Sequence, residues 1–341
     1  MVTHKAWKKN LLIKYLCPRD FSRGEMEEIM GKILITPRGY AKYGEEYKKQ
    51  LEAAGYEVDW NDTGKPVPRE VFVEKAKEAE GIIVGVDSCN RELLLQCKNL
   101  KSIVKFGIGV DNIDLPTCEE MGIKVGRCIG TNSNAVAELT VGMMFACARD
   151  LVSNAMDVKN HEWVKPTGFE LYGKKVGIIG FGNIGKHVAR MANGIGMQVY
   201  CYDAFPVKQE VLDEYHATFT TVEDILKNCD FISLHVPLTE ETKDMISTEE
   251  FKMMKKTAVL VNAARGGIVN EHAIYEALKN GEVKAVASDV WTTEPPKDED
   301  WIQELLAMKN FILTAHIASR SQEAEINTVK RSTEVMLDNL M

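Results

Sequence analysis

Short apolar runs alternate with amphipathic stretches from residue 32 onward. Runs rich in Ile, Val and Leu have the length of buried strands, whereas apolar residues three to four positions apart indicate helices. In the first part of the chain we predict strands at 32–36, 56–60, 81–86, 102–106 and 123–126, and helices at 43–54, 69–79, 90–97 and 116–121. Regular alternation with short links predicts a parallel, doubly wound α/β sheet.

A second alternating series follows a long predicted helix at 133–158, for which Asn132 or Ser133 is the candidate N-cap. Two strand–helix–strand–helix–strand halves in this order are typical of a dinucleotide-binding sheet. The terminal helix at 322–340 is predicted to fold back on the first sheet, which would make the first domain discontinuous. The second series has predicted strands at 175–179, 198–202, 218–220, 230–234, 258–262, 284–288 and 311–314, and predicted helices at 222–228, 248–255 and 271–279.

Composition and charge narrow the class of protein. Hydrophobic residues make up 45% of the 341 residues and charged residues 27%, as in ordinary globular proteins. The net charge of −8 makes nucleic acid a poor partner, because an acidic chain repels phosphate backbones. No run approaches about 20 apolar residues and the N-terminus does not match a signal peptide, so we expect no membrane association and a cytoplasmic location.

The eight cysteines show neither a C-x-x-C pair nor the clustered spacing of a zinc site. Several of them lie inside apolar runs, as Cys147 does. We therefore expect buried, reduced thiols and no bound metal.

A glycine-rich turn follows the first strand of the second series. Residues 180–185 read G-F-G-N-I-G, between a predicted strand and a predicted helix. In this context Gly180 permits the tight turn, Gly182 lets a pyrophosphate approach the backbone, and Gly185 lets the helix pack on the strand. Asp203 ends the next strand, where a carboxylate binds ribose hydroxyls and repels a 2′-phosphate. These residues predict NAD as the cofactor, and a plain glycine-rich turn is the alternative.

Reduction of a 2-oxo acid by hydride transfer requires a cation for the carboxylate, an acid for the developing alkoxide, and a group that orients this acid. Arg265 follows a strand and precedes two glycines, which suits a carboxylate, although a surface salt bridge is the alternative. Of seven histidines, only His235 and His316 follow strands of the second series, and His316 follows the last strand. Glu294, if paired with His316, would orient the imidazole and favour its protonated form.

Seven runs of residues belong together: KFGIGVDNID, NSNAVAELTVGMM, VGIIGFGNIG, HVPLTEET, VNAARGGIVNE, ASDVWTTEPP and AHIASRSQEA. In combination they resemble the D-isomer-specific 2-hydroxyacid dehydrogenase family, most closely its phosphoglycerate-dehydrogenase-like branch. The resemblance covers about nine tenths of the chain. It implies an oxidoreductase with flavodoxin-like and Rossmann domains and an active-site cleft between them. The expected division is an N-terminal extension at 1–30, a substrate-binding domain at 31–127 plus 320–341, and an NAD-binding domain at 128–319.

The resemblance also implies roles for individual residues. Arg265 matches the substrate-binding arginine, His316 the acid/base histidine and Glu294 its partner. Asp289 matches an aspartate that meets the nicotinamide carboxamide, and a homodimer built on residues 133–170 is implied. Further matches to cofactor-binding positions are Asn183, Ile184, His235, Val236, Pro237, Thr242, Ala263 and Ala318. Matches to the substrate region are Gly107, Ile108, Gly109 and Asn132.

Departures from the family pattern concern the substrate. The phosphoglycerate branch has Arg-Ser after the strand that ends near Val84, to hold phosphate. This chain has Gly85-Val86-Asp87 there, so Asp87 is a candidate substrate-site residue that would repel phosphate. Arg320 stands where a small residue is usual, so it is a candidate contact for a distal substrate group, with solvent or a partner subunit as the alternative. We therefore expect an unphosphorylated acid such as hydroxypyruvate or glyoxylate, with D-3-phosphoglycerate as the alternative. The end at residue 341 predicts no C-terminal regulatory domain.

Two other functions compete with this interpretation. NAD(H)-responsive co-repressors share the fold, but the sequence shows no peptide-docking or nuclear-targeting feature. Formate dehydrogenases are similar but have glutamine where this chain has Glu294.

Overall fold

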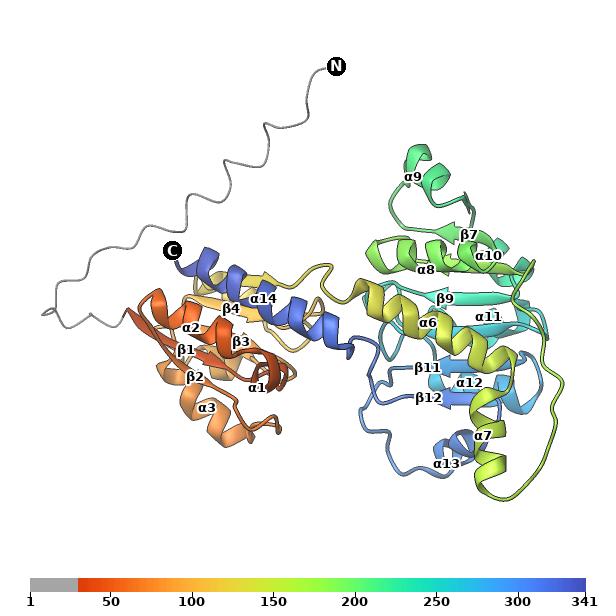
Figure 1. Cartoon of the computed structure of the whole chain (residues 1–341), viewed down its shortest axis with the longest axis horizontal. Coiled ribbons are helices and arrows are strands. Elements are labelled where there is room, and N and C mark those ends of the chain that lie inside the picture. The colour runs from red at the N-terminus through yellow and green to blue at the C-terminus, as the bar shows by residue number, and fades with distance from the viewer. Residues whose placement is uncertain (1–29) are drawn as a thin grey trace, which may run out of the picture.

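The computed structural model describes residues 30–341 and contains two separate parallel β-sheets, each covered by helices (Figure 1). The first sheet has the strand order β2-β1-β3-β4-β5. This is the flavodoxin-like order, and every pair of neighbouring strands is parallel. Its strands are β1 (Gly31–Ile35), β2 (Tyr56–Trp60), β3 (Gly81–Val84), β4 (Ser102–Lys105) and β5 (Lys124–Arg127).

The second sheet has the order β12-β11-β10-β9-β6-β7-β8 and is also parallel throughout. The order reverses between β6 and β9, which is the switch point of a Rossmann sheet. The prediction of two doubly wound sheets is confirmed. The strands are β6 (Lys175–Ile179), β7 (Gln198–Tyr202), β8 (Ala217–Phe219), β9 (Phe231–Leu234), β10 (Val259–Asn262), β11 (Ala285–Ser288) and β12 (Phe311–Leu313).

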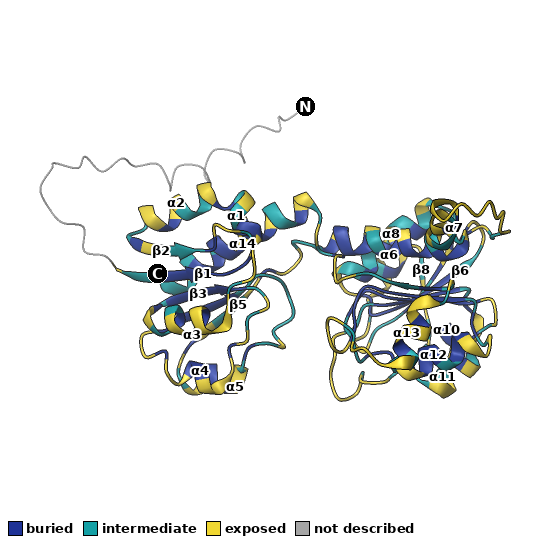
Figure 2. Cartoon of the chain, turned by 90° about the horizontal axis from the view of Figure 1, so that it is seen from below, coloured by how far each residue is buried: buried dark blue, intermediate teal, exposed yellow. Residues whose placement is uncertain are grey.

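Helices cover both faces of each sheet, so the central strands are buried (Figure 2). The first sheet is covered by α1 (Gly39–Tyr43), α2 (Glu45–Ala53), α3 (Arg69–Glu78), α4 (Arg91–Leu94), α5 (Leu115–Glu120) and α14 (Gln322–Leu340). With the second sheet lie α6 (Ser133–Ala148), α7 (Leu151–Lys159), α8 (Asn183–Gly194), α9 (Gln209–Glu214), α10 (Val222–Asn228), α11 (Thr248–Met253), α12 (Glu271–Lys279) and α13 (Asp300–Ala307). Of these helices, α1, α9 and α13 were not predicted.

The C-terminal helix α14 returns to the first sheet, as predicted, and packs on β3, β4 and β5. Its polar side chains meet the buried hydroxyl of Tyr40, which lies 2.9 Å from Ser332 Oγ and 2.8 Å from Thr333 Oγ1. A buried hydroxyl needs such partners, because its desolvation is otherwise unfavourable. The last helix is therefore an integral layer of the half that begins the chain.

The single helix predicted at 133–158 is wrong in one respect, since it is divided into α6 and α7. Asp150 lies between them in the left-handed conformation, with φ +49°. The carbonyl of Ala148 accepts a hydrogen bond from the amide of Phe169, 3.0 Å away. A segment about twenty residues further along the chain thus bonds to a carbonyl at the end of α6. The local sequence pattern contains no sign of this contact.

The seven cysteines from Cys89 onward are buried and unpaired, as predicted, and Cys17 lies outside the described residues. The signal-peptide prediction and nearly all of the extension at 1–30 also fall outside them. Among residues 30–341, no helix is both long enough and apolar enough to cross a membrane.

Candidate active site

The turn between β6 and α8 has the geometry of a dinucleotide-binding loop. Gly180 has φ +99°, a conformation that glycine adopts without strain. A Cβ on Gly185 would overlap the carbonyl of Gly180, so only glycine permits the close packing of helix on strand. A Cβ on Gly182 would meet no atom within 4 Å, so the turn is open where a pyrophosphate would approach the helix N-terminus. These residues fit a bound dinucleotide.

Asp203 lies beside this turn, just after β7. One carboxylate oxygen accepts a hydrogen bond from the amide of Phe181 at 2.7 Å, and the other accepts one from Phe205 at 3.0 Å. The two bonds fix the carboxylate between the ends of β6 and β7. Each oxygen has further lone pairs for the ribose hydroxyls of NAD.

The remaining candidate cofactor residues form two groups on this edge of the sheet. Ala263, Ala318 and Ile184 pack together with residues of α6, although they come from distant parts of the sequence. The other group follows β9 and contains His235, Val236, Pro237 and Thr242. Within it, Thr242 Oγ1 donates to the carbonyl of Pro237 at 2.6 Å. Asn183, the first residue of α8, is exposed.

His235 is held away from proton-transfer chemistry. Its Nε2 lies 2.6 Å from the Ser233 hydroxyl, and burial lowers the pKa of the imidazole to about 3. Its Nδ1 is buried and has no hydrogen-bond partner among residues 30–341. The ring is therefore neutral at physiological pH, which leaves His316 as the other candidate histidine at a strand end.

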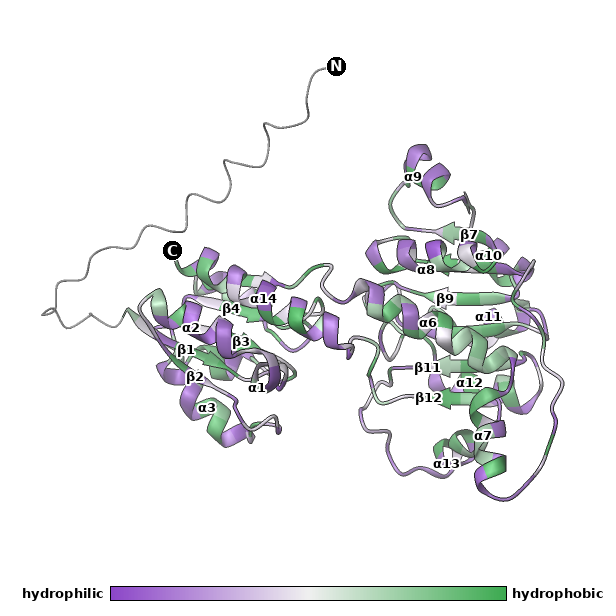
Figure 3. Cartoon of the chain, in the orientation of Figure 1, coloured by the Kyte–Doolittle hydropathy of each residue, from purple (hydrophilic) through white to green (hydrophobic). Residues whose placement is uncertain are grey.

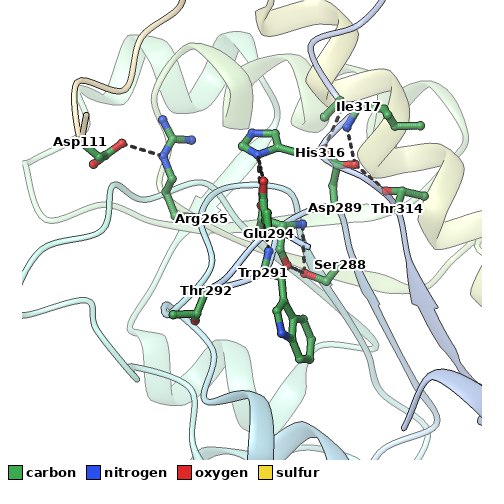
Figure 4. A network of polar contacts seen from close by, with 12 residues as sticks. Asp111, Arg265, Ser288, Asp289, Trp291, Thr292, Glu294, Thr314, His316 and Ile317 are labelled. Atoms are coloured by element: carbon green, nitrogen blue, oxygen red, sulfur yellow. Dashed lines mark hydrogen bonds and ion pairs between the residues drawn. The ribbon is translucent and has the colours of Figure 1, made fainter. Parts of the chain in front are cut away.

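His316 and Glu294 form a direct pair at the carboxyl ends of β12 and β11 (Figure 4). The Nδ1 of His316 is 3.0 Å from Glu294 Oε2, and Glu294 Oε1 also accepts the amide of Trp291 at 3.1 Å. Both side chains are partly exposed. His316 has φ +52°, an unfavourable conformation for a residue with a side chain, which the surrounding turn must hold.

Asp289 provides that support from below the turn. It is fully buried, and its oxygens accept the amides of Ile317 and Ala318, each at 2.8 Å, together with the hydroxyl of Thr314. The amide of His316 donates to the Asp289 carbonyl at 2.9 Å. The predicted contact between Asp289 and the nicotinamide stays a prediction, while its contacts within the protein fix the segment that carries His316.

Arg265 follows β10 and extends toward the other half of the molecule. Its Nη1 donates to the carbonyl of Ala264 at 2.7 Å, and its Nε lies 3.3 Å from Asp111 Oδ2, in the loop after β4 (Figure 4). A Cβ on Gly109 would overlap Arg265 Nη2, so glycine is needed for this approach. The structure thus brings Arg265 to the predicted substrate loop Gly107–Ile108–Gly109.

Two of the other three predicted substrate residues have partners elsewhere. Asp87 accepts the Thr36 hydroxyl at 2.6 Å, and Arg320 forms an ion pair with Glu325 at 2.9 Å. Asn132 is the N-cap residue just before α6 and makes no side-chain cap hydrogen bond, and its Oδ1 is buried without a partner among residues 30–341. Among the described residues, none of these three forms a hydrogen bond or an ion pair with Arg265 or His316, so their roles stay predictions.

Lys105 is a charged residue of this region that sequence reasoning missed. Its Nζ donates to Gly85 O and to Asn112 Oδ1 at 2.6 Å, behind the substrate loop. Burial, and then the nearby Arg265 charge, lower the pKa of this amine to about 8. A lysine directly before the F-G-I-G run was the available signal, but nothing in the sequence showed that the strand end would be buried.

The Rossmann sheet, with an open glycine turn after β6 and a histidine–glutamate pair at the same edge, has the architecture of a dinucleotide-dependent oxidoreductase. Residues 141–318 match the family model described as D-isomer specific 2-hydroxyacid dehydrogenase, NAD binding domain. Hydroxypyruvate reductase from Thermotoga maritima is 39% identical over 280 residues, which are 82% of this chain and 87% of the relative. The chain belongs to the D-isomer specific 2-hydroxyacid dehydrogenase family and is an NAD-dependent oxidoreductase.

Two further comparisons extend this result. D-3-phosphoglycerate dehydrogenase from Methanocaldococcus jannaschii is 38% identical over 300 residues. The match covers 87% of this chain but spans only 55% of that relative's length. The crystal structure of D-lactate dehydrogenase from Aquifex aeolicus, complexed with NAD and lactic acid, is 31% identical, with a TM-score of 0.75. That match covers 89% of this chain and 93% of the solved chain.

Proposed function

We propose that this enzyme interconverts a small D-2-hydroxy acid and its 2-oxo acid, with Arg265 binding the carboxylate and His316 as acid and base. The observation that carries the proposal is the hydrogen bond between His316 Nδ1 and Glu294 at the sheet edge that also presents Arg265. A proton donor, its orienting carboxylate and a cation are the groups that reduction of a 2-oxo acid requires.

Arg265 and the loop 107–109 would bind the head group of the substrate. The Nη2 of Arg265 lies against Gly109, so a carboxylate at this point can meet both the guanidinium and backbone N–H groups of the loop. The positive charge would also polarise the adjacent 2-carbonyl. This arrangement fixes the reacting carbon relative to His316.

His316 would transfer the proton. Because Nδ1 donates to Glu294, Nε2 is the nitrogen that gives a proton to the carbonyl oxygen during reduction and takes it from the hydroxyl during oxidation. Glu294 stabilises the positive charge that the imidazole carries before reduction and after oxidation. NAD, when bound at the β6–α8 turn, supplies or accepts the hydride at the 2-carbon.

The charges around the site favour an unphosphorylated substrate. Asp87 adds a negative charge at the end of β3, and the charge of Arg320 is already matched by Glu325. The ammonium group of Lys105 already donates to two acceptors within the protein. Hydroxypyruvate and glyoxylate, rather than D-3-phosphoglycerate, are therefore the substrates we favour.

We further propose that the two halves of the molecule bind different ligands. The half formed by 31–127 and 320–341 would bind the substrate, and 128–319 would bind NAD. The first sheet contributes the loop 107–109, whereas the glycine turn, Arg265, Glu294 and His316 all follow strands of the second sheet. We propose a cytoplasmic location for the enzyme.

We propose a homodimer from the exposed apolar side chains of α7, a helix that is partly green in Figure 3, and from two exposed aromatic side chains in the following segment 160–172. Trp163 is 80% exposed and Tyr172 76%, values that are unfavourable for such large side chains in a monomer. A second copy would cover this surface on both chains at once. Sedimentation should show that Trp163→Asp converts a dimer to a monomer, whereas Val71→Asp on α3 leaves the dimer intact. A wild-type monomer would contradict the proposal.

The proposed reaction is tested by NADH oxidation with a panel of 2-oxo acids: glyoxylate, hydroxypyruvate, pyruvate, a branched 2-oxo acid and phosphohydroxypyruvate. We expect one or two unphosphorylated acids to be reduced, and His316→Ala to lose at least 10²-fold in kcat. The exposed His272, on α12, provides the matched control variant His272→Ala, with unchanged activity. A preference for phosphohydroxypyruvate would contradict the proposed substrate class, and unchanged activity of His316→Ala would contradict the mechanism.

A further inference from the structure

Asp111 makes a contact across the two halves of the molecule that the proposed reaction does not explain. It lies in the loop after β4, whereas its partner Arg265 follows β10, 154 residues later. The Nε of Arg265 and Oδ2 of Asp111 are 3.3 Å apart. The carboxylate of Asp111 therefore contacts the guanidinium that we propose to bind the substrate.

Two of the three guanidinium nitrogens of Arg265, Nη1 and Nε, bond to acceptors in the protein, and the third is Nη2. Nη1 donates to the carbonyl of Ala264, the residue before Arg265. Nε is held by Asp111, which belongs to the half of the molecule that contains the first sheet. Nη2 then lies against the backbone of Gly109. The two anchors thus direct the third nitrogen to the loop at which the substrate carboxylate is proposed to bind.

The ion pair contributes little to the stability of the fold. The side chain of Asp111 is 63% exposed and that of Arg265 34%, and exposed pairs typically contribute less than about 1 kcal/mol. Asp111 also lies near the Lys105 ammonium and partly offsets its repulsion by Arg265. Because the carboxylate of Asp111 contributes little to stability, its contact with Arg265 matters mainly for the orientation of the guanidinium.

We propose that Asp111 is a positioning residue, which holds the Arg265 guanidinium so that Nη2 faces the substrate loop. Because Asp111 and Arg265 belong to opposite halves, the guanidinium is aligned only when the halves lie together as they do here. Asp111 need not touch the substrate to act in this way. The inference rests on the proposed function of Arg265 and specifies how the chain prepares that residue.

Removal of the Asp111 carboxylate should weaken substrate binding more than it slows the chemical step. For Asp111→Ala we expect KM for the preferred 2-oxo acid to rise about 10-fold, with kcat reduced less than 3-fold. Asp111→Asn should restore most of the affinity, because its amide oxygen still accepts a hydrogen bond from Nε. The affinity for NADH should stay unchanged, since no cofactor residue contacts Asp111 among the described residues.

The direct test is oxamate binding to the enzyme–NADH complex, followed by NADH fluorescence. We expect Asp111→Ala to weaken oxamate about 10-fold. A matched control is Asp114→Ala, which removes the same charge from the same loop; Asp114 caps α5 through the amide of Thr117, and its loss should affect stability but not oxamate.

Three outcomes would overturn the proposal. Tighter oxamate binding by Asp111→Ala would show that Asp111 competes with the substrate for Arg265. Equal losses of oxamate and NADH affinity would show a purely structural role. No oxamate binding by the wild-type enzyme–NADH complex would remove the proposed function, and the role of Asp111 with it.

Discussion

The imidazole of His316 and the carboxylate of Glu294 are joined through Nδ1, at 3.0 Å from Oε2 and 3.2 Å from Oε1. This contact leaves Nε2 as the nitrogen that can exchange a proton with a substrate. It also joins two loops that follow adjacent strands, β11 and β12. The imidazole that we propose as the proton donor is thus oriented by the fold before any substrate binds.

Replacement of Glu294 by glutamine keeps a similar shape but removes the negative charge. We expect Glu294→Gln to reduce kcat on the order of 10²-fold, because the imidazolium loses its stabilising partner. NADH binding should not change. Glu299→Gln, which alters an exposed carboxylate bonded to Trp301 instead, is the matched control. Wild-type kcat in Glu294→Gln would show that the charge of Glu294 has no role in proton transfer.

Two glycines of the α8 region provide a matched test of the cofactor site. A Cβ added at Gly182 or at Gly194 meets no atom within 4 Å, so neither substitution strains the fold. Only Gly182 lies in the turn where a pyrophosphate would approach. We expect Gly182→Ala to raise the Kd for NADH about 10-fold in a fluorescence titration, because the added methyl group would keep the pyrophosphate away from the backbone. Equal effects of both substitutions would place the dinucleotide elsewhere.

The loss of Asp289 should destabilise the protein as well as the site. Asp289→Ala leaves the amides of Ile317 and Ala318 without their acceptor in a buried region. We expect a loss of about 3 kcal/mol in the free energy of unfolding, measured with urea, together with a lower kcat. A loss below about 1 kcal/mol would mean that another group satisfies these amides.

Lys105 should make stability depend on pH in the alkaline range. Its pKa is about 8 in the folded protein and near 10.5 in the unfolded chain, so the unfolded chain binds the proton more strongly. Between these values, the free energy of unfolding should rise with pH by at most about 1.4 kcal/mol per unit from this residue. Lys105→Met should lack the rise.

The measurement is the urea midpoint of both proteins from pH 7 to pH 10.5. The difference between them isolates the residue, because the other titrating groups are common to both. Lys101→Met, which alters a side chain that is 62% exposed, should follow the wild-type curve. Parallel curves for Lys105→Met and the wild type would contradict the lowered pKa.

Most strands of both sheets were predictable from sequence because their runs are apolar and end at turn residues. Strands such as β6 and β7 match the prediction at both ends. The helices α1, α9 and α13 were missed, because five to eight residues give few turns for a clear period, although α5 and α11, with six residues each, were predicted. The division between α6 and α7 depends on the contact from Phe169, which lies outside any local window.

The candidate site was predictable as far as single residues carry their own signal. Gly180, Asp203, Arg265 and His316 each follow a strand, and parallel strands end at the same edge of a sheet. Asp111 lies in the run KFGIGVDNID, yet its approach to Arg265 depends on how two loops 154 residues apart meet. Such pairings come from tertiary structure, and the sequence around either residue does not contain them.

The return of α14 to the first sheet has a consequence for synthesis. The partners of the Tyr40 hydroxyl lie 292 and 293 positions further along the chain, close to its last residue. During translation, the elements from α6 to β12 leave the ribosome as one uninterrupted series, and they can fold as a unit while the earlier half still lacks one layer. The half that is made first is therefore finished last, and until then its exposed strands β3, β4 and β5 are what a chaperone would need to shield.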